Sequence, residues 1–85
     1  MSKSLIVIVG AGPGVSAGIA RKFGSNDFKV ILLARRRESL DLQIAELQNE
    51  NIEAYGITAD ASDSNSLIAA FNQIKSDYGV PDVLI

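Results

Sequence analysis

The sequence predicts an α/β fold in which a parallel β-sheet is covered by helices on both faces. Two observations predict it. Three short apolar runs and one weaker strand-like segment alternate along the chain with three segments of helical periodicity. The segments that join them are only about 3–6 residues long, as in compact α/β units. Strands and helices that alternate in this way form a parallel sheet with right-handed crossovers, in the order β-α-β-α-β-α-β.

The first strand is predicted at residues 5–9, a continuous apolar run, and three glycines within the next five residues follow it. A helix is then predicted over about residues 15–25, because apolar side chains recur every four residues along one face. Gly24 and the polar residues 25–27 are predicted to end this helix.

The second strand is predicted at residues 29–34, which repeat the buried-strand pattern. A basic turn at residues 35–37 leads into a second amphipathic helix, which residues 49–51 close. The third strand is predicted at residues 53–59, where small side chains suit a tight fit. Together these elements predict a doubly wound parallel sheet of the Rossmann type.

Ser62 is predicted to cap the third helix, with Asp63 favourably placed in its first turn. Residues 79–81 are predicted to stop that helix, and residues 82–85 open a fourth apolar strand. An autonomous domain seldom ends on a bare apolar strand. We therefore expect residues 1–85 to be the N-terminal part of a single Rossmann domain within a longer protein.

Composition excludes several classes of function. The chain has no cysteine and no histidine, so disulfides, thiol catalysis and imidazole acid/base chemistry are excluded, and no metal site is expected. A net charge of −2 gives no general attraction for nucleic acid or an anionic membrane. The longest apolar run is far shorter than the roughly 20 residues that span a bilayer, and no signal-peptide pattern is present. A cytoplasmic location is the expectation.

The glycine-rich run at residues 10–16 lies between a buried strand and a helix, where backbone N–H groups and the helix dipole favour an anion. Gly10 is predicted to adopt a positive φ, and Gly14 to let a pyrophosphate approach the backbone. A P-loop is excluded because no Gly-Lys-Ser/Thr follows. The dinucleotide pattern G-x-G-x-x-G read from Gly10 lacks its last glycine, and read from Gly12 it begins two residues late. The alternative interpretation is that the glycines only satisfy the geometry of the turn.

A third register resembles the short-chain dehydrogenase/reductase family, whose turn is T-G-x-x-x-G-x-G. Residues 9–16 match it at both leading glycines. The second strand ends in a polar turn at Arg35, the third ends in Asp60-Ala61, and residues 81–85 are similar to the family's fourth strand. The resemblance covers all 85 residues and implies an NAD(P)-binding domain cut off before its catalytic half. It implies that the following residues hold the cofactor's phosphates: Gly10, Gly12, Pro13, Gly14, Val15 and Ser16.

Three residues depart from the family's turn. Val9 replaces the usual threonine, Ser16 replaces the third glycine, and Pro13 carries neither an N–H nor a charge. These changes leave fewer donors around the phosphates. We expect them to affect cofactor affinity more than the fold.

The end of the second strand indicates the cofactor. NAD-dependent enzymes place an Asp or Glu there to bond the ribose 2′-OH, whereas an arginine can grip a 2′-phosphate. Here Ala34 and Arg35 occupy this place, and the first carboxylate is Glu38. The sequence therefore predicts NADP(H) rather than NAD(H). The alternative for the three arginines is a solvated basic turn that binds no cofactor. This alternative is favoured for Arg37 and disfavoured for Arg35, and for Arg36 the two interpretations are equally supported.

The resemblance implies that Asp60 contacts the amino group of adenine and that the backbone of Ala61 lines the same pocket. The alternative for Asp60 is to begin a turn and favour the next helix. Tyr55 and Tyr78 are assigned no chemistry, because neither has the lysine four residues on that the family's catalytic tyrosine requires.

The predicted function is an NADP(H)-dependent oxidoreductase that interconverts a small-molecule carbonyl and alcohol by hydride transfer. The family's catalytic Asn, Ser, Tyr and Lys would fall beyond Ile85, so no catalytic residue is predicted here and no turnover by these residues alone. A homo-oligomer, formed through the second half of the fold, is expected.

Two alternatives stay open. Residues 7–13 also resemble the start of FAD-dependent oxidoreductases, although these want a glycine at position 15 and an acidic residue after the second strand. A non-catalytic dinucleotide-sensing protein is the other, suggested by the weakened turn at Pro13 and Ser16.

Overall fold

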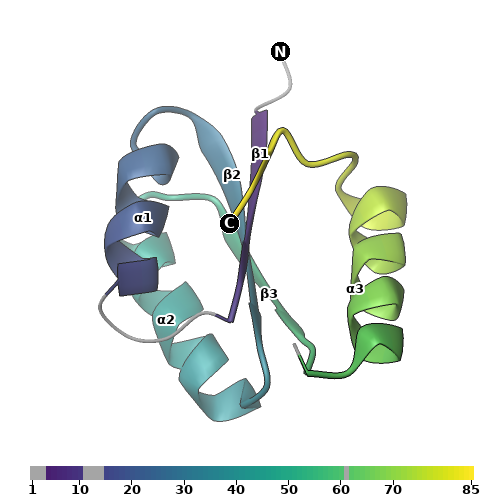
Figure 1. Cartoon of the computed structure of the whole chain (residues 1–85). Helices are drawn as coiled ribbons and strands as arrows, with labels where there is room; N and C mark the ends of the chain where they lie inside the picture. The colour runs from purple at the N-terminus through teal and green to yellow at the C-terminus, as the bar shows by residue number, and fades with distance from the viewer. Residues whose placement is uncertain (1–3, 11–14, 61) are drawn as a thin grey trace.

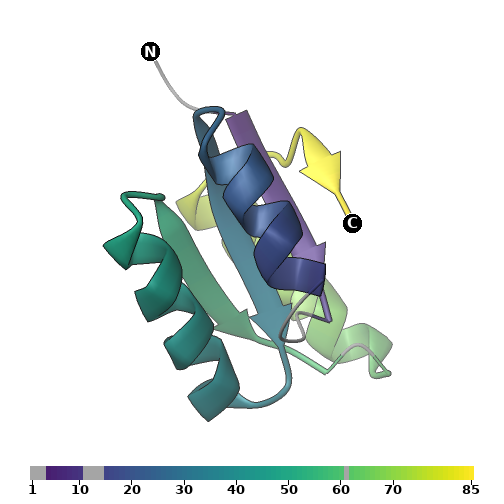
Figure 2. The ribbon, with the colours of Figure 1, turned by 90° about the vertical axis from the view of Figure 1, so that its left-hand side faces the viewer.

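The computed structural model describes residues 4–10, 15–60 and 62–85. Its sheet is entirely parallel and has the spatial order β3-β2-β1-β4. The strands are β1 (Ser4–Val9), β2 (Phe28–Ala34), β3 (Ala54–Thr58) and β4 (Val83–Leu84). Two helices, α1 (Val15–Gly24) and α2 (Arg37–Asn49), cover one face, and α3 (Ser64–Asp77) covers the other (Figures 1 and 2). The predicted doubly wound α/β fold is confirmed.

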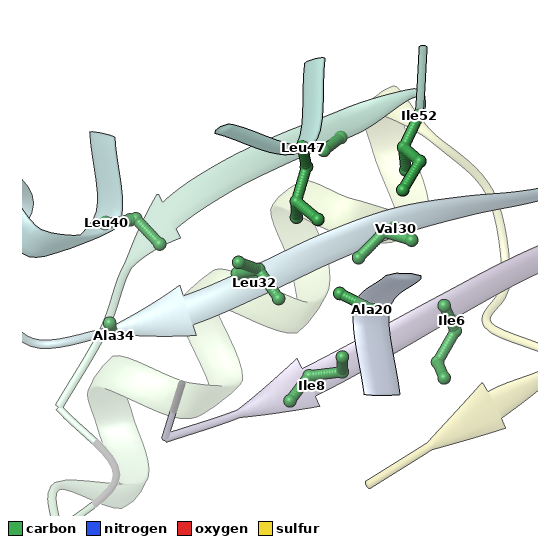
Figure 3. Packing of buried hydrophobic residues seen from close by; sticks show 10 residues of the cluster. Ile6, Ile8, Ala20, Val30, Leu32, Ala34, Leu40, Leu47 and Ile52 are labelled. Carbon is green, nitrogen blue, oxygen red and sulfur yellow. The ribbon is translucent and has the colours of Figure 1, made fainter. Parts of the chain in front are cut away.

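Two apolar layers hold the sheet between its helices. Successive side chains of a strand point to opposite faces, so β1 and β2 send alternate residues into each layer. Under α1 and α2 lie Ile6, Ile8, Val30 and Leu32, packed against Ala20, Leu40 and Leu47 (Figure 3). Toward α3 lie Leu5, Val7, Ile31 and Leu33, packed against Ala70 and Ile74. Burial on both faces explains why these strands read as unbroken apolar runs.

The backbone of β3 lies unusually close to α2. A Cβ added at Gly56 would lie 2.8 Å from Leu40 Cγ and 3.2 Å from Ile44 Cγ1. The tight fit predicted for this strand is therefore present, and its cause is the direct packing of two α2 side chains on the Gly56 backbone.

Element boundaries differ from the predictions by one or two residues. The N-cap of α3 is Asp63 rather than Ser62: Asp63 Oδ1 accepts a hydrogen bond of 3.0 Å from the Asn65 N–H. The hydroxyl of Ser62 instead donates to Asp60. The third and fourth strands are also shorter than predicted, and Arg37 is the first residue of α2 rather than part of the turn.

Candidate nucleotide-binding site

The carboxyl ends of three neighbouring strands meet at one edge of the sheet, at the lower end of Figure 1. Gly10 directly follows β1, Arg35 directly follows β2, and Asp60 comes two residues after β3. Residues far apart in the sequence are thereby brought to a common edge. In open parallel sheets, ligands bind in the crevice outside the carboxyl ends of the strands. This edge is the candidate nucleotide-binding site.

Gly10 begins the turn after β1 in a left-handed conformation, with φ of +73°. Its N–H donates a hydrogen bond of 2.9 Å to the carbonyl of Leu33 in β2. The positive φ predicted for Gly10 is confirmed, and such a φ is one that glycine adopts without steric cost. The neighbouring strand thus fixes where the turn leaves the sheet.

The rest of the predicted phosphate turn is described only at its end. Val15 and Ser16 form the first two positions of α1, so the N-terminus of this helix follows the turn, as an anion site at a helix N-terminus would require. The remaining predicted residues lie outside the described part of the chain: Gly12, Pro13, Gly14 and Ala61.

The three consecutive arginines after β2 have different surroundings. Arg37 forms an ion pair of 3.4 Å with Asp41, one turn further along α2, and both side chains are well exposed. Among the described residues, no ion pair involves Arg35 or Arg36, and both are exposed. The solvated interpretation therefore suits Arg37, which is already paired.

An open groove of about 410 Å³ lies beside the N-terminus of α2, lined by residues 36–39. Arg36 is the N-cap of this helix, with extended backbone angles (φ −99°, ψ 117°) and no side-chain cap. Helix N-termini without such a cap leave backbone N–H groups without an intrahelical partner. Glu38 also lines the groove. Its negative charge interacts favourably with the dipole of α2 but repels an anion that enters the groove. Because Arg37 is paired with Asp41, the groove offers one guanidinium group without an ion pair among the described residues, that of Arg36, and one carboxylate.

Hydrogen bonds from Ser62 fix the side chain of Asp60. Asp60 Oδ1 accepts from both the Ser62 N–H (3.0 Å) and the Ser62 hydroxyl (2.7 Å). The backbone N–H of Asp60 in turn donates to Ser66 Oγ (2.9 Å), and its carbonyl accepts from the Asp63 N–H (3.0 Å). Asp60 thus performs the turn-forming role that was one of its two predicted roles.

The pKa of the Asp60 carboxyl lies below its ordinary value. The hydrogen bond from the Ser62 hydroxyl is the main cause, followed by the bond from the Ser62 N–H, and the positive charge of Arg35 adds to both. Asp60 is therefore ionised at neutral pH and can accept a further donor. No described residue donates to its second oxygen, Oδ2.

Sequence reasoning missed both serines that hold Asp60. The Asp-x-Ser spacing is an Asx-turn signal that points to Ser62. Ser66 has no such local signal, because its contact with Asp60, six residues earlier, depends on how the first turn of α3 is placed relative to the end of β3.

The two tyrosines lie in the apolar layer between the sheet and α3, with ring centroids 4.9 Å apart. The Tyr55 hydroxyl donates to Glu53 Oε2 at 2.8 Å, and this bond to a carboxylate raises the pKa of Tyr55 above its ordinary value. Glu53 precedes β3, so this pair sits near the strand end opposite the candidate site. The arrangement agrees with assigning these tyrosines a structural role.

In the described part of the chain, no three His, Cys, Asp or Glu side chains gather as a metal site would need. None of the helices within those residues is both long and apolar enough to cross a membrane.

Comparison with known proteins identifies the family. The family model for short chain dehydrogenases matches residues 4–85, so the chain belongs to this family. A metagenomic short-chain oxidoreductase solved with NADP has 34% identity and a TM-score of 0.90 over 99% of this chain. A variant of actinorhodin polyketide ketoreductase solved with NADPH has 30% identity and a TM-score of 0.92 over 96% of this chain. The C alpha-dehydrogenase of Sphingobium sp. is 28% identical over 92% of this chain.

The chain spans only part of each of these relatives. It covers 38% of the metagenomic oxidoreductase, 31% of the ketoreductase and 26% of the C alpha-dehydrogenase. The similarity therefore concerns the segment that carries the candidate nucleotide-binding edge.

Proposed function

We propose that the protein binds NADP(H) at the carboxyl edge of its sheet and serves as the cofactor-binding part of a carbonyl reductase or alcohol dehydrogenase. The observation that carries this proposal is the environment of Arg35. Arg35 directly follows β2, is exposed, has no ion-pair partner among the described residues, and follows an alanine where NAD-binding sites want a carboxylate.

Each end of the adenosine moiety has a candidate partner. Arg35 can donate two parallel N–H···O bonds to a 2′-phosphate, and Arg36, the next residue, lines the groove at the N-terminus of α2. Asp60, ionised and two residues beyond β3, can accept the amino group of adenine. We propose that Gly10 and the N-terminus of α1 bind the pyrophosphate of such a ligand, since a helix N-terminus favours an anion.

The bound nicotinamide would supply or accept a hydride, while the protein orients the cofactor. The residues described here contribute binding and orientation only. We propose that the groups that bind the substrate and move its proton come from a further part of the protein, as does the surface for a homo-oligomer. The family assignment favours this proposal over an FAD-dependent oxidoreductase.

Direct binding measurements test the proposal. Dissociation constants of the purified protein for NADPH and NADH are measured by calorimetry in the same buffer. We expect NADPH to bind more tightly by at least about tenfold, the equivalent of one good charged hydrogen bond. Equal or tighter binding of NADH would refute the cofactor preference, and carbonyl reduction by these 85 residues alone would refute the division of roles.

A further inference from the structure

Ser62 donates two hydrogen bonds to one of the two carboxylate oxygens of Asp60. Its backbone N–H and its hydroxyl both donate to Oδ1, at 3.0 and 2.7 Å, and no described residue donates to Oδ2. A carboxylate that rotated freely could offer either oxygen to a ligand. With Oδ1 held by two donors from one residue, the Asp60 side chain is fixed in one orientation, and Oδ2 is the oxygen left for a further donor.

Ser66 fixes the backbone of Asp60 as Ser62 fixes its side chain. The Ser66 hydroxyl lies in the first turn of α3 and accepts the Asp60 N–H at 2.9 Å. The residue is therefore anchored both to the turn that follows it and to the helix beyond. A side chain anchored in this way loses little conformational entropy when a ligand binds to it.

The chemistry of the remaining oxygen is restrictive. Oδ2 belongs to an ionised carboxylate, so it accepts hydrogen bonds and donates none. An amino group on a purine ring satisfies it, whereas an oxo group at the same position would bring two acceptors together. A buried or partly buried acceptor that faces another acceptor costs free energy, and this asymmetry makes such sites selective.

We propose that Ser62 is a positioning residue that makes this site discriminate 6-amino from 6-oxo purine dinucleotides. This inference rests on the proposed function, because it requires the base to lie at Asp60. Ser62 touches no ligand in this proposal: it acts by holding Asp60 so that Oδ2 meets the amino group.

The test compares NADP with deamino-NADP, in which an oxo group replaces the 6-amino group of the base. The protein is expected to bind NADP at least about tenfold more tightly, and Ser62→Ala should reduce this ratio to about threefold or less. Ser62→Thr keeps a hydroxyl and is expected to restore the ratio. Ser76→Ala, an exposed serine in the last turn of α3, is the matched control and should leave the ratio unchanged.

A second measurement does not depend on the nucleotide. Carbon-detected NMR titration of the Asp60 carboxyl should give a pKa closer to the ordinary aspartate value in Ser62→Ala than in the wild type, because the hydroxyl donor is lost. Circular dichroism confirms that each variant is folded. This readout reports on the hydrogen bond from the Ser62 hydroxyl to Asp60 itself, which a general loss of stability would not remove.

The outcomes separate the two proposals. The proposed role of Ser62 is wrong if NADP and deamino-NADP bind the wild type equally. It is also wrong if Ser62→Ala keeps the full ratio of the two affinities, or if the pKa of Asp60 is unchanged in this variant. If the wild type binds no NADP at all, the proposed function itself is wrong and the inference falls with it.

Discussion

Leu5 and Asp82 are joined by two hydrogen bonds, each 2.8 Å long: the Leu5 N–H donates to Asp82 Oδ2, and the Asp82 N–H donates to the Leu5 carbonyl. Leu5 lies in β1, and Asp82 directly precedes the two-residue strand β4. The carboxylate extends a ladder that would otherwise be very short. At the other end of this ladder the Val9 N–H donates to the Ile85 carbonyl at 2.8 Å, immediately before Gly10.

Removal of the Asp82 carboxylate should loosen β4. Asp82→Ala leaves the Leu5 N–H without its acceptor, so we expect the free energy of unfolding to fall by about 1–2 kcal/mol, the lower part of the range for a charged hydrogen bond, because the bond is only partly buried. Urea denaturation measures this change in the free energy of unfolding. Asp77→Ala, an exposed aspartate at the end of α3, is the matched control and should stay within about 0.5 kcal/mol of the wild type. Equal losses in both variants would contradict the role of Asp82.

A methyl group at Gly56 should disrupt the contact between α2 and β3. The added Cβ would meet the Leu40 side chain, which is fully buried and cannot move aside into solvent. We expect Gly56→Ala to lower the free energy of unfolding by about 1–3 kcal/mol, the usual cost of overpacking a core. Gly18→Ala in α1 is the control: it meets no neighbour within 4 Å and should stabilise the helix by up to about 1 kcal/mol. A Gly56→Ala variant as stable as the wild type would show that α2 can shift freely.

The fold was predictable because strands buried on both faces have continuous apolar runs in the sequence. β1 and β2 send side chains into two apolar layers, so neither strand shows the alternation that a half-exposed strand would show. The N-cap of α3 was placed one residue early for a different reason. Ser62 and Asp63 are both good caps, and in the structure Asp63 accepts from the Asn65 N–H while the Ser62 hydroxyl donates to Asp60.

The candidate site was predictable in its positions but not in its contacts. The positive φ of Gly10 follows from a strand that runs directly into a glycine turn. The sequence distinguished Arg35 from Arg37 by their positions after the second strand, but it did not predict the ion pair of Arg37. This ion pair arises because α2 begins at Arg37 and places Asp41 one turn further on, where the two side chains meet.

The hydrogen bond between Tyr55 and Glu53 should give the protein a distinct alkaline titration. Because the bond raises the pKa of Tyr55 in the folded state above the ordinary value of 10.0, it contributes stability that is fully present below pH 10. That stability is lost as the pH rises through the folded pKa. We expect Glu53→Gln to bring the ionisation of Tyr55 to lower pH, as followed by phenolate absorbance, with Tyr55→Phe to assign the signal. Glu46→Gln, an exposed glutamate of α2, should leave the titration unchanged.

Arg35 should determine the preference for NADP(H). Arg35→Ala removes the guanidinium that we place on the 2′-phosphate, so we expect the Kd for NADPH to rise about 10- to 100-fold, as for the loss of a charge-assisted hydrogen bond. The Kd for NADH, which has no 2′-phosphate, should change by less than about threefold. Arg37→Ala is the matched control, because Arg37 is already paired with Asp41 and should affect both cofactors little.

Arg36 completes this series, since it occupies the N-cap position of α2 and lines the same groove as Arg37 without an ion pair among the described residues. If Arg36 shares the 2′-phosphate, Arg36→Ala should weaken NADPH selectively, and Arg35→Ala with Arg36→Ala should weaken it further than either change alone. If Arg36 is only solvated, its variant should behave like Arg37→Ala. Equal weakening of NADPH and NADH by Arg35→Ala would place this arginine on a part of the ligand common to both cofactors and would contradict the proposed preference.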